Sequence, residues 1–113
     1  MNQVTIKNNF ITLTVLDYGA IIQKLILKNK NGVDTNVVVG LEEPEKYLMD
    51  NKSLGACIGR YAGRISKGGF HINNVHYPIF SKDGVHLHGG QKGFGKRYWT
   101  IEQVHDGESP FVK

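Results

Sequence analysis

At 113 residues the chain is long enough for one small domain and too short for two. Hydrophobic residues make up 40% and charged residues 21%, which is an ordinary globular composition and excludes a disordered chain. The net charge of +4 comes mainly from lysines spread along the sequence, so no nucleic-acid partner is predicted, and no stretch approaches the ~18 consecutive apolar residues of a membrane span.

Cysteine usage and the N-terminus bear on the cellular compartment. Cys57 is the only cysteine, so no internal disulfide can form, which is typical of a reducing environment. The first ten residues have neither an apolar signal core nor a basic leader. We therefore expect a cytoplasmic protein, with Cys57 acting as a small buried hydrophobe in its apolar run.

The first part of the chain predicts β-strands. Ile11, Leu13 and Val15 alternate with threonines, the period-two pattern of a half-buried strand. The sequence Asp-Tyr-Gly at residues 17–19 then predicts a turn. These features favour a half-buried strand that ends at a turn.

A second strand is predicted over residues 20–28. Ile21 and Leu25 fall on one face in this pattern, together with Leu27, while lysines occupy the other face. The following segment, 29–34, contains the dipeptide Asn-Gly, which is a strong hairpin signal.

The next segments predict a third strand and a single short helix. Val37–Val39 form a β-branched run ended by glycine, which is typical of a strand covered on both faces. Residues 42–49 favour a helix of one or two turns, because Pro44 suits a first turn and acidic residues cluster at its N-terminus.

The remainder of the chain predicts loops and hairpins. Residues 50–64 are irregular, and a clear hairpin follows with Asn73-Asn74 at its turn. Residues 81–97 are polar and glycine-rich and predict a long loop. Strand character resumes at 99–104 and again at Phe111-Val112. With 14 glycines and one short helix, the sequence predicts an all-β fold.

Two motifs carry a family resemblance. The first is Gly59–Ile65 (GRYAGRI), and the second is Leu87–Gly90 (LHGG), followed by Gly93-Phe94 and Trp99. Either motif alone is weak, but their order, their spacing and the hairpin between them resemble the aldose 1-epimerase (galactose mutarotase) family. The resemblance covers roughly residues 4–104, and the family's chains are much longer.

The resemblance implies a fold and an activity. The chain would form the N-terminal part of a large antiparallel β-sandwich, with residues 1–113 as a partial epimerase domain. The family, an isomerase family of hexose metabolism, interconverts the α and β anomers of aldoses such as galactose and glucose without a cofactor. Arg64 and His88 would line the sugar pocket, and His88 would assist proton transfer. The family's proton donor, a second histidine, and its proton acceptor, a glutamate, match no residue here, so enzymatic activity of the chain itself is left open.

Three alternatives remain at this point. The chain can be a piece of a mutarotase that is inactive alone, a non-catalytic sugar-binding module, or a structural β-domain that self-associates or pairs with a C-terminal piece through surfaces such as Val37–Val39 and Phe111-Val112. A sugar phosphate can replace the neutral aldose. His71 and His76 flank one turn like a metal pair, but no third ligand follows at a known spacing, so no metal is predicted.

Overall fold

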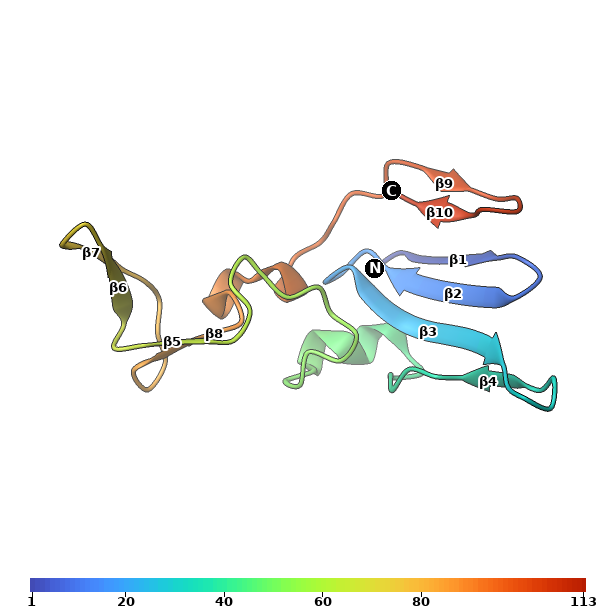
Figure 1. Cartoon of the computed structure of the whole chain (residues 1–113), viewed down its shortest axis with the longest axis horizontal. Helices are drawn as coiled ribbons and strands as arrows, with labels where there is room; N and C mark the ends of the chain where they lie inside the picture. The colour runs from blue at the N-terminus through green and yellow to red at the C-terminus, as the bar shows by residue number, and fades with distance from the viewer.

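A computed structural model describes residues 1–113 and is built from short strands, three 3-10 helices and no α-helix. The predicted all-β class is confirmed. The molecule is elongated, with extents of 55 × 28 × 27 Å and a radius of gyration of 17.5 Å, against about 13 Å for a compact domain of this length. A four-stranded sheet lies at one end and a separate hairpin at the other (Figure 1). None of the helices is long or apolar enough to cross a membrane.

The main sheet is an antiparallel meander. Its strands β1 (Gln3–Lys7), β2 (Ile11–Leu16), β3 (Ile21–Lys28) and β4 (Asp34–Asn36) follow one another in chain order. The predicted turns lie where expected between them. Gly32, for example, has a φ of +74° in the β3–β4 turn, a conformation that favours glycine.

A β-bulge at Gln23 interrupts the pairing of β2 with β3. Val15 pairs with Ile22, but Thr14 pairs with Lys24, so Gln23 has no partner on β2. An extra residue in one strand shifts all later side chains to the opposite face. The bulge therefore decides which face each residue of β3 occupies.

The bulge makes one sequence prediction wrong. Ile21 was expected to share a face with Leu25, but Ile21 pairs with Leu16 and lies on the same face as Lys24. A strictly alternating pattern cannot reveal an inserted residue, so the error begins where the regular period ends.

The bulged glutamine is itself a structural anchor. Gln23 is only 1% exposed. Its Nε2 donates to the carbonyl oxygens of Leu41 and Glu42 at 2.9 and 3.0 Å, and its Oε1 accepts from Nε2 of Gln3 at 2.5 Å. A buried amide with these partners is satisfied, and it holds the loop before the first helix against the sheet.

The small core lies between the sheet and that helix. Leu16, Ile21 and Tyr47 are each 2% exposed and pack together. Tyr47 comes from η1 (Pro44–Met49), a 3-10 helix that starts two residues later than the predicted range of 42–49 and has Pro44 in its first turn, as expected. Its hydroxyl accepts a hydrogen bond from the Leu41 N–H at 2.8 Å.

The helix also settles which face of β2 is buried more deeply. Thr14 and Leu16 are buried, Leu13 and Val15 are half-buried, and Ile11 is 42% exposed. The prediction of a half-buried strand is therefore confirmed, but its more deeply buried face carries Thr14 and Leu16 instead of Ile11, Leu13 and Val15. The physical reason is that η1 packs over the opposite face, and alternation alone does not say which face a later segment covers.

The second half of the chain forms two isolated strand pairs. Strand β5 (Arg64–Ser66) pairs with β8 (Val85–Leu87), and β6 (Gly69–Ile72) pairs with β7 (Val75–Pro78). Asn73 and Asn74 make the β6–β7 turn with φ of +48° and +63°, which confirms the predicted hairpin. This hairpin lies at the far end of the molecule from the main sheet (Figure 1).

The valine run does not form a strand. After β4, Oδ1 of Asn36 accepts hydrogen bonds from the backbone N–H groups of Leu25 and Val38 at 3.1 and 3.3 Å. The Leu25 N–H is thus bonded to a side chain instead of a backbone carbonyl, while the Val37 N–H still donates to the Leu25 carbonyl at 2.9 Å. Val39 is 79% exposed, so the predicted burial on both faces is wrong.

Two later predictions are corrected as well. Residues 81–97 are not one loop, because they contain β8 and the 3-10 helices η2 (Gly90–Lys92) and η3 (Phe94–Lys96). The strand predicted at 99–104 shrinks to β9 (Val104–His105). It pairs with β10 (Phe111–Val112), which lies where a strand was expected. The proposed association surfaces, residues 37–39 and 111–112, are largely exposed, and self-association stays a prediction.

Candidate functional site

One turn of the main sheet anchors both motif-bearing segments. In the turn after β2, the carbonyl of Asp17 accepts a hydrogen bond from the Trp99 N–H at 2.7 Å. Gly19 donates to the carbonyl of Arg97 at 2.7 Å and accepts from the N–H of Cys57 at 2.9 Å. The Cys57 side chain is exposed, contrary to the predicted burial. The turn thus fixes the segments just before the first motif and just after the second.

The two motifs meet through their backbones. Phe94 donates to the carbonyl of Gly59 at 3.0 Å, and His88 donates to the carbonyl of Gly63 at 2.9 Å. Gly89 lies so close that a Cβ on it would stand 1.9 Å from the Gly59 oxygen, and its φ is +83°. Only glycine fits such a crossing. The glycines of both motifs therefore permit the contact that builds the site.

His88 has an uncommon backbone and a fixed ring. Its φ is +50°, a left-handed conformation that few residues other than glycine adopt. Its Nδ1 accepts a hydrogen bond from the backbone N–H of Gly63 at 3.0 Å. His86, two residues earlier, is held differently, because its Nδ1 donates to the carbonyl of Phe80 at 2.6 Å. Nδ1 is therefore a hydrogen-bond acceptor in His88 and a donor in His86.

Arg64 is the one arginine of the three whose guanidinium makes no hydrogen bond, ion pair or aromatic contact within the chain. Arg60 lies over the ring of Phe94, 5.3 Å from its centroid, and Nε of Arg97 donates to a backbone carbonyl at 2.7 Å. Arg64 opens β5, paired in register with Leu87, and its side chain is exposed. Its five donors are thus free for a ligand.

Arg64 and His88 line the same cleft, which has a volume of about 1000 Å³. Its other walls come from the turn after β2, from the end of η1 and the loop that follows it, and from residues 80–96. Sequence reasoning missed the wall at Leu48 and Met49, although Met49 is 87% exposed beside the cleft. Both residues belong to the short helix predicted at 42–49, but no sequence pattern indicated that this helix lies beside the two motifs.

The cleft carries an excess of positive charge. Its charged lining residues are Lys52, Arg64, Lys82 and Lys96 on the cationic side and Asp50 and Asp83 on the acidic side. None of the four cations takes part in an ion pair. Both carboxylate oxygens of Asp50 already accept backbone N–H groups, at 2.8 Å each. Asp83 is the only acidic side chain in the cleft without such a bond.

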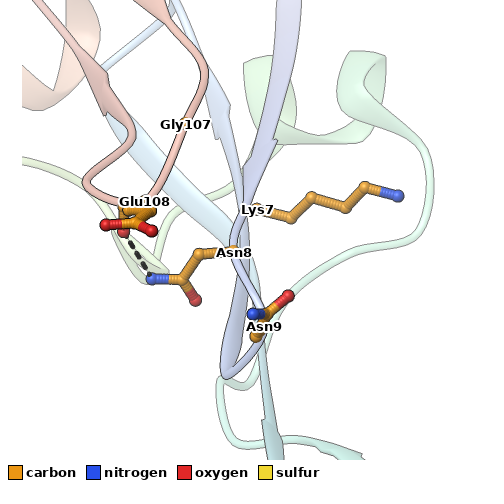
Figure 2. Close-up of a pocket in the computed structure, with 5 residues that line it drawn as sticks. All are labelled: Lys7, Asn8, Asn9, Gly107 and Glu108. Carbon is orange, nitrogen blue, oxygen red and sulfur yellow. Dashed lines mark hydrogen bonds between the residues drawn. The ribbon is translucent and has the colours of Figure 1, made fainter.

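A second hollow lies away from the motifs. It has a volume of about 500 Å³ and is formed by the β1–β2 turn and the β9–β10 turn, without hydrophobic lining. Figure 2 shows the side chain of Asn8 reaching the other turn, where its Nδ2 donates to the carbonyl of Glu108 at 3.3 Å. This contact links the two hairpins, and none of the predicted site residues lies there.

The hairpin histidines are also separate from the cleft. His71 and His76 face each other across β6 and β7, with ring centroids 4.7 Å apart. No group of three or more histidine, cysteine, aspartate or glutamate side chains gathers in a geometry that could hold a metal ion. Neither histidine lines the cleft that holds Arg64 and His88.

Comparison with known proteins places this geometry in one family. The aldose 1-epimerase family profile matches residues 2–112. The chain is 34% identical to the galactose mutarotase of Homo sapiens over 103 residues, which is 90% of this chain and 30% of that protein. It is 33% identical to the aldose 1-epimerase of Escherichia coli strain K12 over 111 residues, 96% of this chain and 32% of that protein.

Solved structures agree with the sequence relatives. A GalM/aldose epimerase homologue from C. elegans superposes with a TM-score of 0.82 at 32% identity, covering 90% of this chain and 32% of that one. The galactose 1-epimerase from Lactobacillus acidophilus superposes with a TM-score of 0.77 at 30% identity. The chain thus spans about 30% of the length of the curated relatives it matches. By its profile match and by the structures it resembles, this chain belongs to the aldose 1-epimerase family.

Proposed function

We propose that the chain supplies part of the sugar-binding site of an aldose 1-epimerase, an enzyme that interconverts the α and β anomers of aldohexoses such as galactose. The observation that supports the proposal is that Arg64 and His88, which come from two different motifs, line one cleft. The backbone contacts of Gly59 and Gly63 hold the two motifs together. A site assembled in this way presents fixed polar donors to a small ligand.

The reaction needs two proton transfers and one bond rotation. A base removes the proton from the anomeric hydroxyl, and the electron pair forms the carbonyl at C1 as the bond to the ring oxygen breaks. An acid gives its proton to that ring oxygen. Rotation about C1–C2 exposes the other face of the aldehyde, and the reverse steps close the ring. Each positioned acid or base typically contributes about 10²–10⁴-fold.

Within this scheme the chain's own residues bind rather than transfer protons. The Arg64 guanidinium offers several donors to sugar hydroxyls and keeps its charge at all working pH values. The imidazole of His88 can hydrogen-bond to an oxygen near the reacting carbon. The family's proton donor and acceptor match no residue of this chain, so we expect binding without appreciable turnover from the 113 residues alone.

Polarimetry and a binding titration test the proposal together. Freshly dissolved α-D-galactose should mutarotate at the buffer rate in the presence of the chain, while NMR signals of Arg64 and His88 should shift as D-galactose is added. The matched control is His71→Ala, on the distant hairpin, which should leave the titration unchanged. Clear acceleration of mutarotation that is abolished by His88→Ala would contradict the assignment of the acid and base to residues outside this chain. The absence of any NMR shift on addition of D-galactose would contradict the binding role of Arg64 and His88.

A second candidate ligand is an anionic sugar. It is favoured by the three lysines of the cleft, Lys52, Lys82 and Lys96, none of which has an ion-pair partner. Opposite charge in a partly enclosed cleft raises affinity for an anion and makes it depend on salt. Adding galactose 6-phosphate to the same titration separates the candidates, because a phosphate preference should weaken as ionic strength rises and a galactose preference should not.

A further inference from the structure

We propose that the backbone N–H of Gly63 is a positioning group that holds His88 in one neutral tautomer, with its proton on Nε2, so that His88 acts toward a ligand only as a hydrogen-bond donor. The assignment of a sugar oxygen as the acceptor rests on the function proposed above. The tautomer itself rests only on the geometry of Gly63 and His88.

Two hydrogen bonds join Gly63 and His88. The carbonyl of Gly63 accepts from the N–H of His88 at 2.9 Å, and the N–H of Gly63 donates to Nδ1 of the same histidine at 3.0 Å. One residue therefore fixes both the backbone and the ring. The left-handed φ of His88, +50°, belongs to this arrangement, and such conformations persist where surrounding contacts impose them.

The contact at Nδ1 decides which ring nitrogen of His88 carries the proton. A neutral imidazole carries one proton, and the nitrogen without it is the acceptor. Because Nδ1 receives the Gly63 N–H, its lone pair is occupied and the proton belongs on Nε2. Nε2 has no hydrogen-bond partner within the chain, and His88 lines the cleft. The group left for a ligand is therefore an N–H.

An Nε2–H group suits one role in the reaction and not the other. A donor stabilises an oxygen that gains negative charge, such as the anomeric oxygen when it loses its proton. The same Nε2 cannot take the anomeric proton, because it already carries one. The hydrogen bond at Nδ1 therefore prevents His88 from acting as the proton acceptor.

The backbone angle at position 63 restricts which residues can hold the His88 ring there. Gly63 has a φ of +93°, but a Cβ placed there would meet nothing closer than a ring carbon of Tyr61 at 4.0 Å. The limit is thus the backbone angle and not the available space. Asparagine tolerates positive φ, whereas a β-branched residue does not. The two classes of substitution should therefore have different effects on the His88 ring.

Long-range ¹H–¹⁵N NMR of the histidine rings in the 113-residue chain, recorded at about pH 8, tests the tautomer directly. His88 should show its proton on Nε2, and His86 should show the opposite tautomer because its Nδ1 donates to a carbonyl. The His86 signal is therefore an internal reference. A His88 proton on Nδ1, or a mixture of tautomers in the unaltered chain, would overturn the proposal.

Substitutions at position 63 test the cause. Gly63→Asn should keep the Nε2–H form, whereas Gly63→Val should release the ring into a mixture. Gly32→Val is the matched control, because Gly32 also has positive φ with open space around it but lies in the β3–β4 turn. It should leave the His88 tautomer unchanged. An unchanged tautomer in a folded Gly63→Val variant would overturn the role of the amide.

A pair of isosteres keeps the proposal testable if Gly63→Val does not fold. Glutamine places its amide nitrogen near the position of Nε2, and asparagine places its amide near Nδ1. His88→Asn should weaken D-galactose binding by about tenfold, the loss expected for a ligand hydrogen bond, and His88→Gln should weaken it less. The reverse order would overturn the donor role. Failure of the unaltered chain to bind D-galactose would count against the proposed function and leave the NMR result for Gly63 standing.

Discussion

The main sheet and the motif region are held together in different ways. Eight of the ten buried residues lie between Ile6 and Tyr47, and three of these, Leu16, Ile21 and Tyr47, pack together between the sheet and η1. The remaining two are Gly59 and Gly93, one from each motif segment. The sheet is stabilised by side-chain burial, whereas the site is assembled from backbone hydrogen bonds at glycines.

This difference matters for how the site can serve a ligand. A region without a packed core relies on the turn at residues 17–19 and on the crossing at Gly59 and Gly89 for its shape. The guanidinium of Arg64 makes no contact within the chain, and both Arg64 and His88 are exposed. Three sets of substitutions, in the sheet, at the crossing and at the site side chains, can break or sharpen this contrast between the two regions.

The largest effect is expected in the sheet. Leu16→Ala should lower the free energy of unfolding by about 2–5 kcal/mol, because it opens a cavity beside Ile21 and Tyr47. Ile11→Ala on the same strand is the control. Ile11 is largely exposed, so its loss should be under about 1 kcal/mol. Urea denaturation of both variants provides the comparison, and equal losses would mean that the core is not where the packing places it.

A smaller effect is expected at the crossing of the motifs. Gly89→Ala places a Cβ against the carbonyl of Gly59 and should cost about 2 kcal/mol or more. Gly84→Ala also has positive φ but meets nothing within 4 Å, so it should cost only about 1 kcal/mol of backbone strain. Hydrogen exchange of the Phe94 amide, which bonds to the Gly59 carbonyl, should accelerate only in the first variant. The same exchange rate in both variants would show that the close approach of Gly89 to the Gly59 carbonyl does not stabilise the site.

Sequence predictions that depend on local preferences succeeded, and those that depend on contacts with other segments failed. The turns at Asp17–Gly19, Asn31-Gly32 and Asn73-Asn74 are confirmed, because positive φ is a preference of the residue itself. The valine run at 37–39 depends on a side-chain bond from Asn36 and was predicted wrongly. The bulge at Gln23 likewise depends on a loop near Leu41 that no local pattern reveals.

The site shows the same division. The two motifs located Arg64 and His88, and the structure brings both to one cleft. The wall at Leu48 and Met49 was missed, because it arises from the packing of η1 on the sheet. The contact between the Gly63 amide and the His88 ring depends on two backbone angles 25 residues apart in sequence. Residue types can therefore indicate which side chains line the cleft, but not which backbone groups hold them.

The smallest effect on stability, and a clear one on function, is expected from the site side chains themselves. Both Arg64 and His88 are exposed, and the Arg64 guanidinium has no partner in the chain. In a polypeptide that carries this chain together with the rest of the family's length, Arg64→Ala and His88→Ala should each lower turnover by at least about tenfold, or ~1.4 kcal/mol of transition-state stabilisation. The free energy of unfolding should change by less than about 0.5 kcal/mol for Arg64→Ala.

His71→Ala and His76→Ala provide the matched controls for that experiment. They remove the same kind of side chain from a hairpin that contributes nothing to the cleft, so turnover should stay within about twofold of the unaltered protein. Equal losses of turnover in the hairpin variants would mean that Arg64 and His88 are not the residues that set the turnover. A loss of stability at Arg64 as large as that at Leu16 would break the contrast itself, since the site would then depend on its side chains for folding as the sheet does. Turnover and urea denaturation measured on the same four variants separate these outcomes, because a binding residue moves the first and a structural residue moves the second.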